Sequence, residues 1–140
     1  MKKLLSTDRV AIVAPSIYAA AAVPAALTST SIDTINYNQA IIALSILNET
    51  AAGTYVVTMT ECATTDGDFT AVAATVFAAN TTSVDDTTTV LNLEAAVHQM
   101  KRFVKVVVTS AGSSSESTIY GTVTLGDRDY APASTINQTA

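Results

Sequence analysis

Apolar and polar residues alternate along several stretches of this chain, which is the pattern of strands that bury one face. The clearest stretch is residues 102–109, where one face carries Val104, Val106 and Val108. Residues 54–62 and 118–125 show the same period of two, and in the second of these Tyr120 is predicted to point outward. Because successive side chains of a strand point to opposite sides, each stretch predicts a half-buried strand.

Residues 39–47 differ, because apolar side chains occupy both alternating sets of positions. One set contains Ala40, Ile42, Leu44 and Ile46, and the other contains Ile41, Ala43 and Leu47. A run of this kind predicts a central strand that is covered on both faces. A buried helix is the competing interpretation, and periodicity alone does not exclude it.

The remaining segments complete a pattern of short elements separated by polar turns. Strands are predicted at residues 28–34, 69–79 and 87–93, turns at 64–68 and 80–86, and one helical turn within 94–100. The Asp-Gly pair in the first turn is typical of a reversal between strands. About seven short strands at regular spacing predict an all-β fold, a single antiparallel β-sandwich or jelly roll that spans residues 28–126.

Residues 1–27 are predicted to form an extended apolar arm, and residues 127–140 an extended tail. Pro15 and Pro24 argue against one continuous helix in the arm. An apolar segment without a local core is expected to lie on a neighbouring subunit or on another protein. The arm residues predicted to bind a partner are Ile12, Val13, Ile17, Tyr18, Val23 and Leu27.

The start of the chain also imitates a secretory signal peptide, since a basic stretch precedes an apolar one. Asp8 and Arg9 at the beginning of the apolar run, and Pro15 within it, argue against a cleaved signal. The run is too short and too interrupted to span a bilayer, so no membrane partner is expected.

Composition narrows the function classes. The chain carries a formal net charge of −5 with seven Lys and Arg residues. Phosphate binding needs clustered cations, so no nucleic-acid partner is expected. The basic segment of Lys101, Arg102 and Lys105 is predicted to make salt bridges at the rim of the fold or to contact an acidic neighbour.

Few residues could carry chemistry. The chain has one Cys, Cys62, and one His, His98, and it lacks phosphate-loop and nucleophile-elbow motifs. The acidic pairs are Asp66 and Asp68, Asp85 and Asp86, and Asp127 and Asp129. They are interpreted as solvated turn residues, and whether one loop binds Ca²⁺ stays open. The sequence therefore predicts a protein that is not an enzyme and that has no catalytic, cofactor or metal site.

The order of several short motifs resembles a known family. The motifs are Ile32-Asp33-Thr34-Ile35-Asn36-Tyr37, the apolar run 40–47, Val56-Val57-Thr58-Met59-Thr60-Glu61-Cys62, Asp66-Gly67-Asp68-Phe69, the basic strand that begins at Lys101, and Val123-Thr124-Leu125-Gly126-Asp127-Arg128-Asp129-Tyr130-Ala131-Pro132. Over residues 29–132 this order resembles the capsid decoration, or cement, proteins of tailed bacteriophages.

The resemblance implies a structural virion protein, commonly a trimer, on the exterior of the capsid. It would bind the major capsid protein, bridge neighbouring subunits and so stabilise the head. The apolar arm is not part of the pattern, and it could grip the capsid or exchange between subunits. Two alternatives stay open: another virion subunit of the tail, head fibre or adaptor, and an extracellular carbohydrate-binding or adhesive β-sandwich. The absence of Trp counts against sugar stacking.

Overall fold

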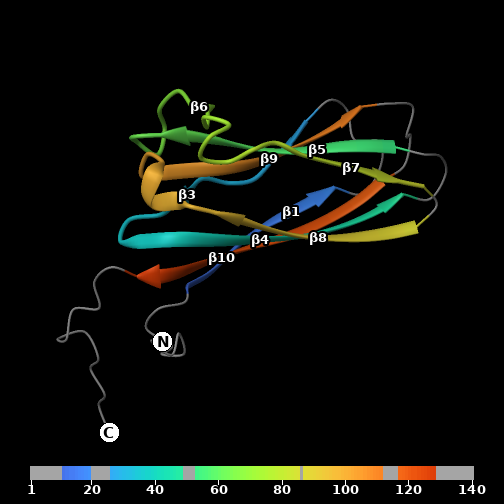
Figure 1. The fold of residues 1–140 in the computed structure, drawn as a ribbon, viewed down its shortest axis with the longest axis horizontal. Helices are drawn as coiled ribbons and strands as arrows, with labels where there is room; N and C mark the ends of the chain where they lie inside the picture. Colours follow the sequence, from blue (N-terminus) through green and yellow to red (C-terminus); the bar gives the residue numbers. More distant parts are fainter. Residues whose placement is uncertain (1–10, 20–25, 49–52, 86, 112–116, 129–140) are drawn as a thin grey trace, which may run out of the picture.

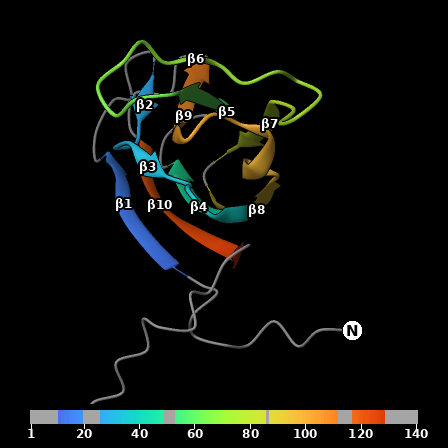
Figure 2. The same cartoon turned by 90° about the vertical axis from the view of Figure 1, so that its left-hand side faces the viewer.

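Two antiparallel sheets packed face to face make up the molecule (Figures 1 and 2). The computed structural model describes residues 11–19, 26–48, 53–85, 87–111 and 117–128. Sheet-on-sheet packing buries the inner face of each sheet and leaves the outer face of each toward solvent. The predicted all-β sandwich is confirmed.

The first sheet has four strands in the order β1-β10-β4-β8. Their bounds are β1 Ala11–Ala19, β10 Ser117–Arg128, β4 Tyr37–Asn48 and β8 Thr87–Ala95. The two inner strands are therefore β10 and β4, which pair along nearly their whole length. Ile42 of β4 lies opposite Val123 of β10 on one side and Leu93 of β8 on the other. The prediction of a central strand at residues 39–47 is confirmed.

The second sheet is built on β9, Phe103–Ala111, and β5, Gly53–Cys62. On the side away from β5, β9 pairs with two short strands, β2 Leu27–Thr28 and β3 Ile32–Asp33. The other side of β5 pairs with β6 Thr70–Ala71 and β7 Asn80–Val84. The 3₁₀ helix η2, Val97–Gln99, connects the two sheets. It confirms the helical turn predicted within residues 94–100.

The core lies between the sheets and follows the predicted alternation. Over most of β4, β5, β9 and β10, buried residues alternate with partly or fully exposed ones. Tyr55 is the largest of the fully buried side chains. Together the strands contribute Ala40, Ile42, Leu44, Ile46, Tyr55, Val57, Met59, Val104, Val106, Val108, Ile119, Val123 and Leu125. Their burial supplies the main driving force for this fold.

The edge predicted at residues 28–34 is present, but it is divided into β2 and β3. Between them the buried Ser29 replaces a regular backbone pair, because its hydroxyl accepts a hydrogen bond from the amide of Val106 at 2.9 Å. The amide of Ser29 in turn donates to the carbonyl of Val106 at 2.9 Å. The side chain thus keeps the backbone of β9 satisfied across the break.

The strand predicted at residues 69–79 is wrong, and so is the turn predicted at 80–86. Only Thr70–Ala71 of the first segment forms a strand, and a turn follows in which the amides of Val76 and Phe77 donate to the carbonyl of Ala73. The segment is rich in Ala, whose small side chain gives little burial on a strand, and Phe77 alone is buried there. The Thr-rich Asn80–Val84 instead pairs with β5 as a strand.

The predicted boundary between arm and sandwich is not where the sheet begins. Ala11–Ala19, assigned to the arm by its sequence, forms β1 and pairs with β10 of the same chain. The register shifts between Val13 and Ile17, around Pro15. Proline has no amide proton and is tolerated on edge strands and at bulges, which is where β1 places it. At the other end, β10 continues to Arg128, two residues into the predicted tail.

Candidate functional site

The outward face of the four-stranded sheet is the most unusual surface of the described molecule. The prediction that β4 is covered on both faces is wrong: Ile42 is 0% exposed, whereas its neighbour Ile41 is 48% exposed. No described element covers that second side of β4. Apolar residues on both faces of a strand therefore do not require two covering layers from the same chain.

Cross-strand register arranges this face in four rows over β10, β4 and β8. Residues directly opposite one another in antiparallel strands share a face, so each row contains one residue from each strand. We call these residues the outer sheet face. The rows are Thr118-Leu47-Thr88, Tyr120-Ser45-Val90, Thr122-Ala43-Asn92 and Thr124-Ile41-Glu94.

The outer sheet face is almost uncharged, and it mixes large hydrophobic residues with Thr, Ser and Asn. Val90 is 64% exposed and Tyr120 is 53% exposed. Together with Ile41, they are three of the four exposed large hydrophobic residues in the described part of the chain. Glu94, in the last row, is its one ionisable carboxylate. Exposed large hydrophobic residues gathered on one nearly uncharged surface are typical of an interaction site.

A shallow depression lies in the middle of the outer sheet face. It has a volume of about 350 Å³ and is lined by Ala43, Leu44, Ser45, Val90, Tyr120, Gly121 and Thr122. The small side chains of Ser45 and Ala43 on the middle strand form its floor, and the larger Val90 and Tyr120 flank it. The alternation over residues 118–125 predicted that Tyr120 points outward, and its exposure confirms this.

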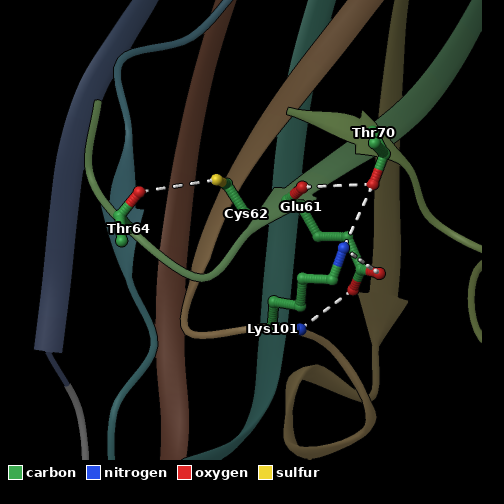
Figure 3. Close-up of polar contacts among 5 residues, drawn as sticks. All are labelled: Glu61, Cys62, Thr64, Thr70 and Lys101. Atoms are coloured by element: carbon green, nitrogen blue, oxygen red, sulfur yellow. Dashed lines mark hydrogen bonds and ion pairs between the residues drawn. The ribbon is translucent and has the colours of Figure 1, made fainter. Parts of the chain in front are cut away.

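A polar cluster lies on the other sheet, where β5, β6 and the end of the η2 connection meet (Figure 3). Glu61 accepts a hydrogen bond from the backbone amide of Lys101 at 2.9 Å, and its carboxylate lies 3.8 Å from the Lys101 ammonium. The same ammonium donates to Thr70 Oγ1 at 3.3 Å. Each polar group shown is matched to a neighbour, so the cluster fixes a connection rather than presenting a ligand site.

Cys62 lies beside this cluster and is buried. Hydrogen bonding from the Thr64 amide lowers the pKa of the Cys62 thiol, while burial opposes that shift. Its Sγ atom lies 3.8 Å from Thr64 Oγ1. A nucleophile needs access as well as thiolate character, and access is what this thiol lacks.

The turn predicted at residues 64–68 is present, and Gly67 lies in it. A Cβ atom at Gly67 would stand 2.5 Å from Cys62 Sγ and 2.5 Å from Thr64 Oγ1. A close approach of the loop therefore explains the glycine. Asp66 and Asp68 are both exposed.

Arg102, just before β9, and Lys105 on β9 each contact another side chain of the same chain. Arg102 donates to both carboxylate oxygens of Asp33, at 3.0 and 2.7 Å, and this ion pair joins β3 to the start of β9. The pKa of Asp33 is lowered mainly by the Arg102 hydrogen bond; burial opposes this effect, and the amide of Ile35 adds a smaller lowering. The Lys105 ammonium lies 4.0 Å from the centroid of the Phe69 ring. The predicted rim salt bridges are confirmed for Lys101 and Arg102, whereas Lys105 lies over an aromatic ring.

His98 lies on η2 as an exposed connector residue. Its Nδ1 is 3.0 Å from the carbonyl oxygen of Asn38, so this nitrogen carries the proton and donates to the start of β4. Asp85 is exposed. The side chains of Asp86, Asp127 and Asp129 lie outside the described residues. Within the described part of the chain, no three His, Cys, Asp or Glu residues gather to hold a metal ion.

The predicted arm residues divide between two places. Ile12, Val13, Ile17 and Tyr18 belong to β1, and Leu27 belongs to β2, where it packs partly buried against the core. Val23 lies outside the described residues. Their binding role stays a prediction.

Comparisons with known proteins add little. No protein-family model and no curated protein sequence matches the chain. Among solved structures, a match described as "CBM4 structure and function", a carbohydrate-binding module, has a TM-score of 0.45 and 12% sequence identity. It covers 74% of this chain and 57% of its own chain. None of the described helices is long and apolar enough to cross a membrane.

Proposed function

We propose that this protein is a structural subunit of a phage virion, a decoration or cement protein that binds the exterior of the capsid. The observation that carries the proposal is the outer sheet face. It offers exposed Ile41, Val90 and Tyr120 on a surface with one carboxylate, which suits contact with another protein. The sequence motifs that resemble decoration proteins supply the capsid as the partner.

The same face is poorly suited to a sugar. Carbohydrate sites combine aromatic platforms with several convergent polar groups. Over β10, β4 and β8 Tyr120 is the one aromatic residue among Ser, Thr, Asn and aliphatic side chains, and Tyr18 of β1 lies opposite it in register. The proposal therefore keeps a protein partner, the major capsid protein, with the N-terminal residues Ile12, Val13, Ile17, Tyr18, Val23 and Leu27 as a second contact region.

Many weak contacts are sufficient for such a role. A subunit that seats in many copies and touches more than one capsid protein gains avidity from each additional contact. No deep pocket or catalytic group is required. A bridging subunit would stabilise the head because it binds the assembled shell and not the separated capsid proteins.

The test is sedimentation of the purified chain with expanded capsids that lack it. We expect saturable binding and heads that resist heating better than undecorated heads. A variant with Ile41→Asp should bind less, while Ile35→Asp, which charges an exposed residue away from this face, should bind as the wild type does. Absence of capsid binding together with binding to glycans would contradict the proposal.

A further inference from the structure

One edge of the two sheets differs from the others. It is formed by β8, which pairs with β4 along nine residues without a register shift, and no described strand pairs with its other side (Figure 2). The opposite edge of the same sheet, β1, shifts register around Pro15. The edges of the second sheet are short, with two residues each in β2, β3 and β6 and five in β7. Among the described strands, β8 therefore has the longest regular free edge.

The sequence of β8 does not protect this edge. Natural proteins keep free edges from pairing with other chains by means of proline, lysine, a bulge or a charge that points inward. β8 reads TTTVLNLEA, and its one charged residue, Glu94, belongs to the outer sheet face. Val76, in the segment before β7, lines a hollow with Glu94 and Ala95, but its amide donates to the carbonyl of Ala73 and not to β8. Within the described part of the chain, the free side of β8 is thus open to an added strand.

The strand is complementary to a second copy of itself. When two copies lie antiparallel with all nine residues paired, Leu91 stands opposite Leu91 at the centre. The other pairs are Thr87-Ala95, Thr88-Glu94, Thr89-Leu93 and Val90-Asn92. Residues of one face meet residues of the same face, and no two charges of the same sign lie opposite each other. A different register would leave part of each strand unpaired, so strand length favours this one.

The margin of the core also favours an added strand. Leu91 and Leu93 pack against the core from β8, but both are only partly buried. A neighbouring strand would cover the side of these leucines that β4 does not cover. In the full register, Leu91 of the second copy supplies part of that cover, and burial of apolar surface stabilises the pair.

A second copy costs less to order than a flexible peptide would. A strand that is already formed loses little conformational freedom when it pairs, whereas a disordered segment must first become extended. Nine paired residues exchange roughly eight to ten backbone hydrogen bonds, and each contributes little because it replaces bonds to water. We therefore expect a weak association whose specificity lies in the register.

We propose that two copies of this chain join edge to edge, with β8 antiparallel to β8, about a two-fold axis between their Leu91 residues. The axis is perpendicular to the sheet, so the two four-stranded sheets continue into each other. Both outer sheet faces then lie on the same side of the pair. The proposal does not depend on the proposed function, but together they would let one pair contact a capsid surface through two faces.

The test is sedimentation analysis of the full chain across a concentration series up to ~1 mM, where even a weak dimer is populated. We expect a monomer–dimer equilibrium for the wild type. Thr88 is exposed, and in the proposed register it lies opposite Glu94 of the other copy. Thr88→Lys creates two opposite-charge pairs and should tighten the dimer about two- to tenfold, while Thr88→Glu should weaken it by a similar factor.

Controls separate the register from the net charge. Thr65 is exposed in the turn after β5, so Thr65→Lys and Thr65→Glu change the net charge equally but away from β8. At ~0.15 M salt they should change association less than about twofold, because distant charges are screened. The double variant of Thr88→Glu and Glu94→Lys should restore a dimer at least as tight as that of the wild type. Far-UV circular dichroism should show that each variant is folded.

Several outcomes would overturn the proposal. They are a wild type that stays monomeric throughout the series, a trimer, two Thr88 variants that shift association in the same direction, and a double variant that stays weakened. A monomer whose capsid binding changes in Thr88→Glu would mean that the edge receives a capsid strand, which also overturns it. Capsid binding is measured separately: a chain that dimerises but ignores capsids contradicts the proposed function alone, and a monomer that binds capsids contradicts the dimer alone.

Discussion

The two faces of β4 can be compared with one substitution at two adjacent positions. Ile42 is fully buried between the sheets and Ile41 is 48% exposed on the outer sheet face. Both lie in β4 between β8 and β10, so the change in strand propensity is matched. Replacing each isoleucine by alanine therefore isolates the effect of burial.

The expected magnitudes follow from the structure. Ile→Ala removes roughly three methylene equivalents, or ~2.4 kcal/mol of transfer free energy at ~0.8 kcal/mol each. At Ile42 a cavity is added, so the total should be about 3–4 kcal/mol, within the range for buried Ile→Ala changes. At Ile41 about half of the side chain is already in water and no cavity forms, so about 1 kcal/mol is expected.

Urea unfolding followed by far-UV circular dichroism measures both values. With a slope of about 2 kcal/mol per molar urea, Ile42→Ala should move the midpoint down by roughly 1.5–2 M and Ile41→Ala by about 0.5 M. The experiment belongs at low protein concentration, so that it reports the unfolding of the single chain. Equal losses for the two variants would refute the conclusion that one face of β4 is uncovered in the single chain.

Two further predictions concern the loop and the rim. Gly67→Ala should destabilise the fold by about 1–3 kcal/mol, because the new methyl collides with Cys62 Sγ, while Gly126→Ala, with nothing within 4 Å, should be nearly neutral in the same unfolding assay. Asp33→Asn should cost at most about 1 kcal/mol at neutral pH, because the ion pair with Arg102 is exposed. The pKa of Asp33 is lowered in the folded chain, so this contribution is present above its ordinary value of 3.8 and disappears as the pH falls through the folded value. A cost for Asp33→Asn that persists in strong acid would contradict the ion-pair explanation.

Local pattern was sufficient to predict much of the sandwich. Val104, Val106 and Val108 are buried on β9 as their alternation indicated, and β5 and β10 follow the same rule. The pattern gave a wrong prediction in the Ala-rich segment before β7, because small residues do not distinguish buried positions from exposed ones. It also failed at β1, where Pro15 argued against regular structure, although an edge strand tolerates a proline at a bulge.

The candidate site was harder to predict, because it is made by register and not by any one segment. Ser45, Val90 and Tyr120 are far apart in sequence and meet only when β8 and β10 pair on either side of β4. The sequence did contain one signal, the apolar residues on both faces of β4. We interpreted it as a strand with two covering layers from its own chain. The same apolar pattern also fits a strand whose second face is covered by another molecule.

Pro15 on β1 has a consequence for how copies of this chain can add to one another. An edge strand with a complete row of amides is a template on which further strands stack without end. Pro15 has no amide proton, and the shifted register around it interrupts the regular row of backbone groups along this edge. An incoming strand would find no continuous template there, so growth of an open-ended sheet along this edge is discouraged.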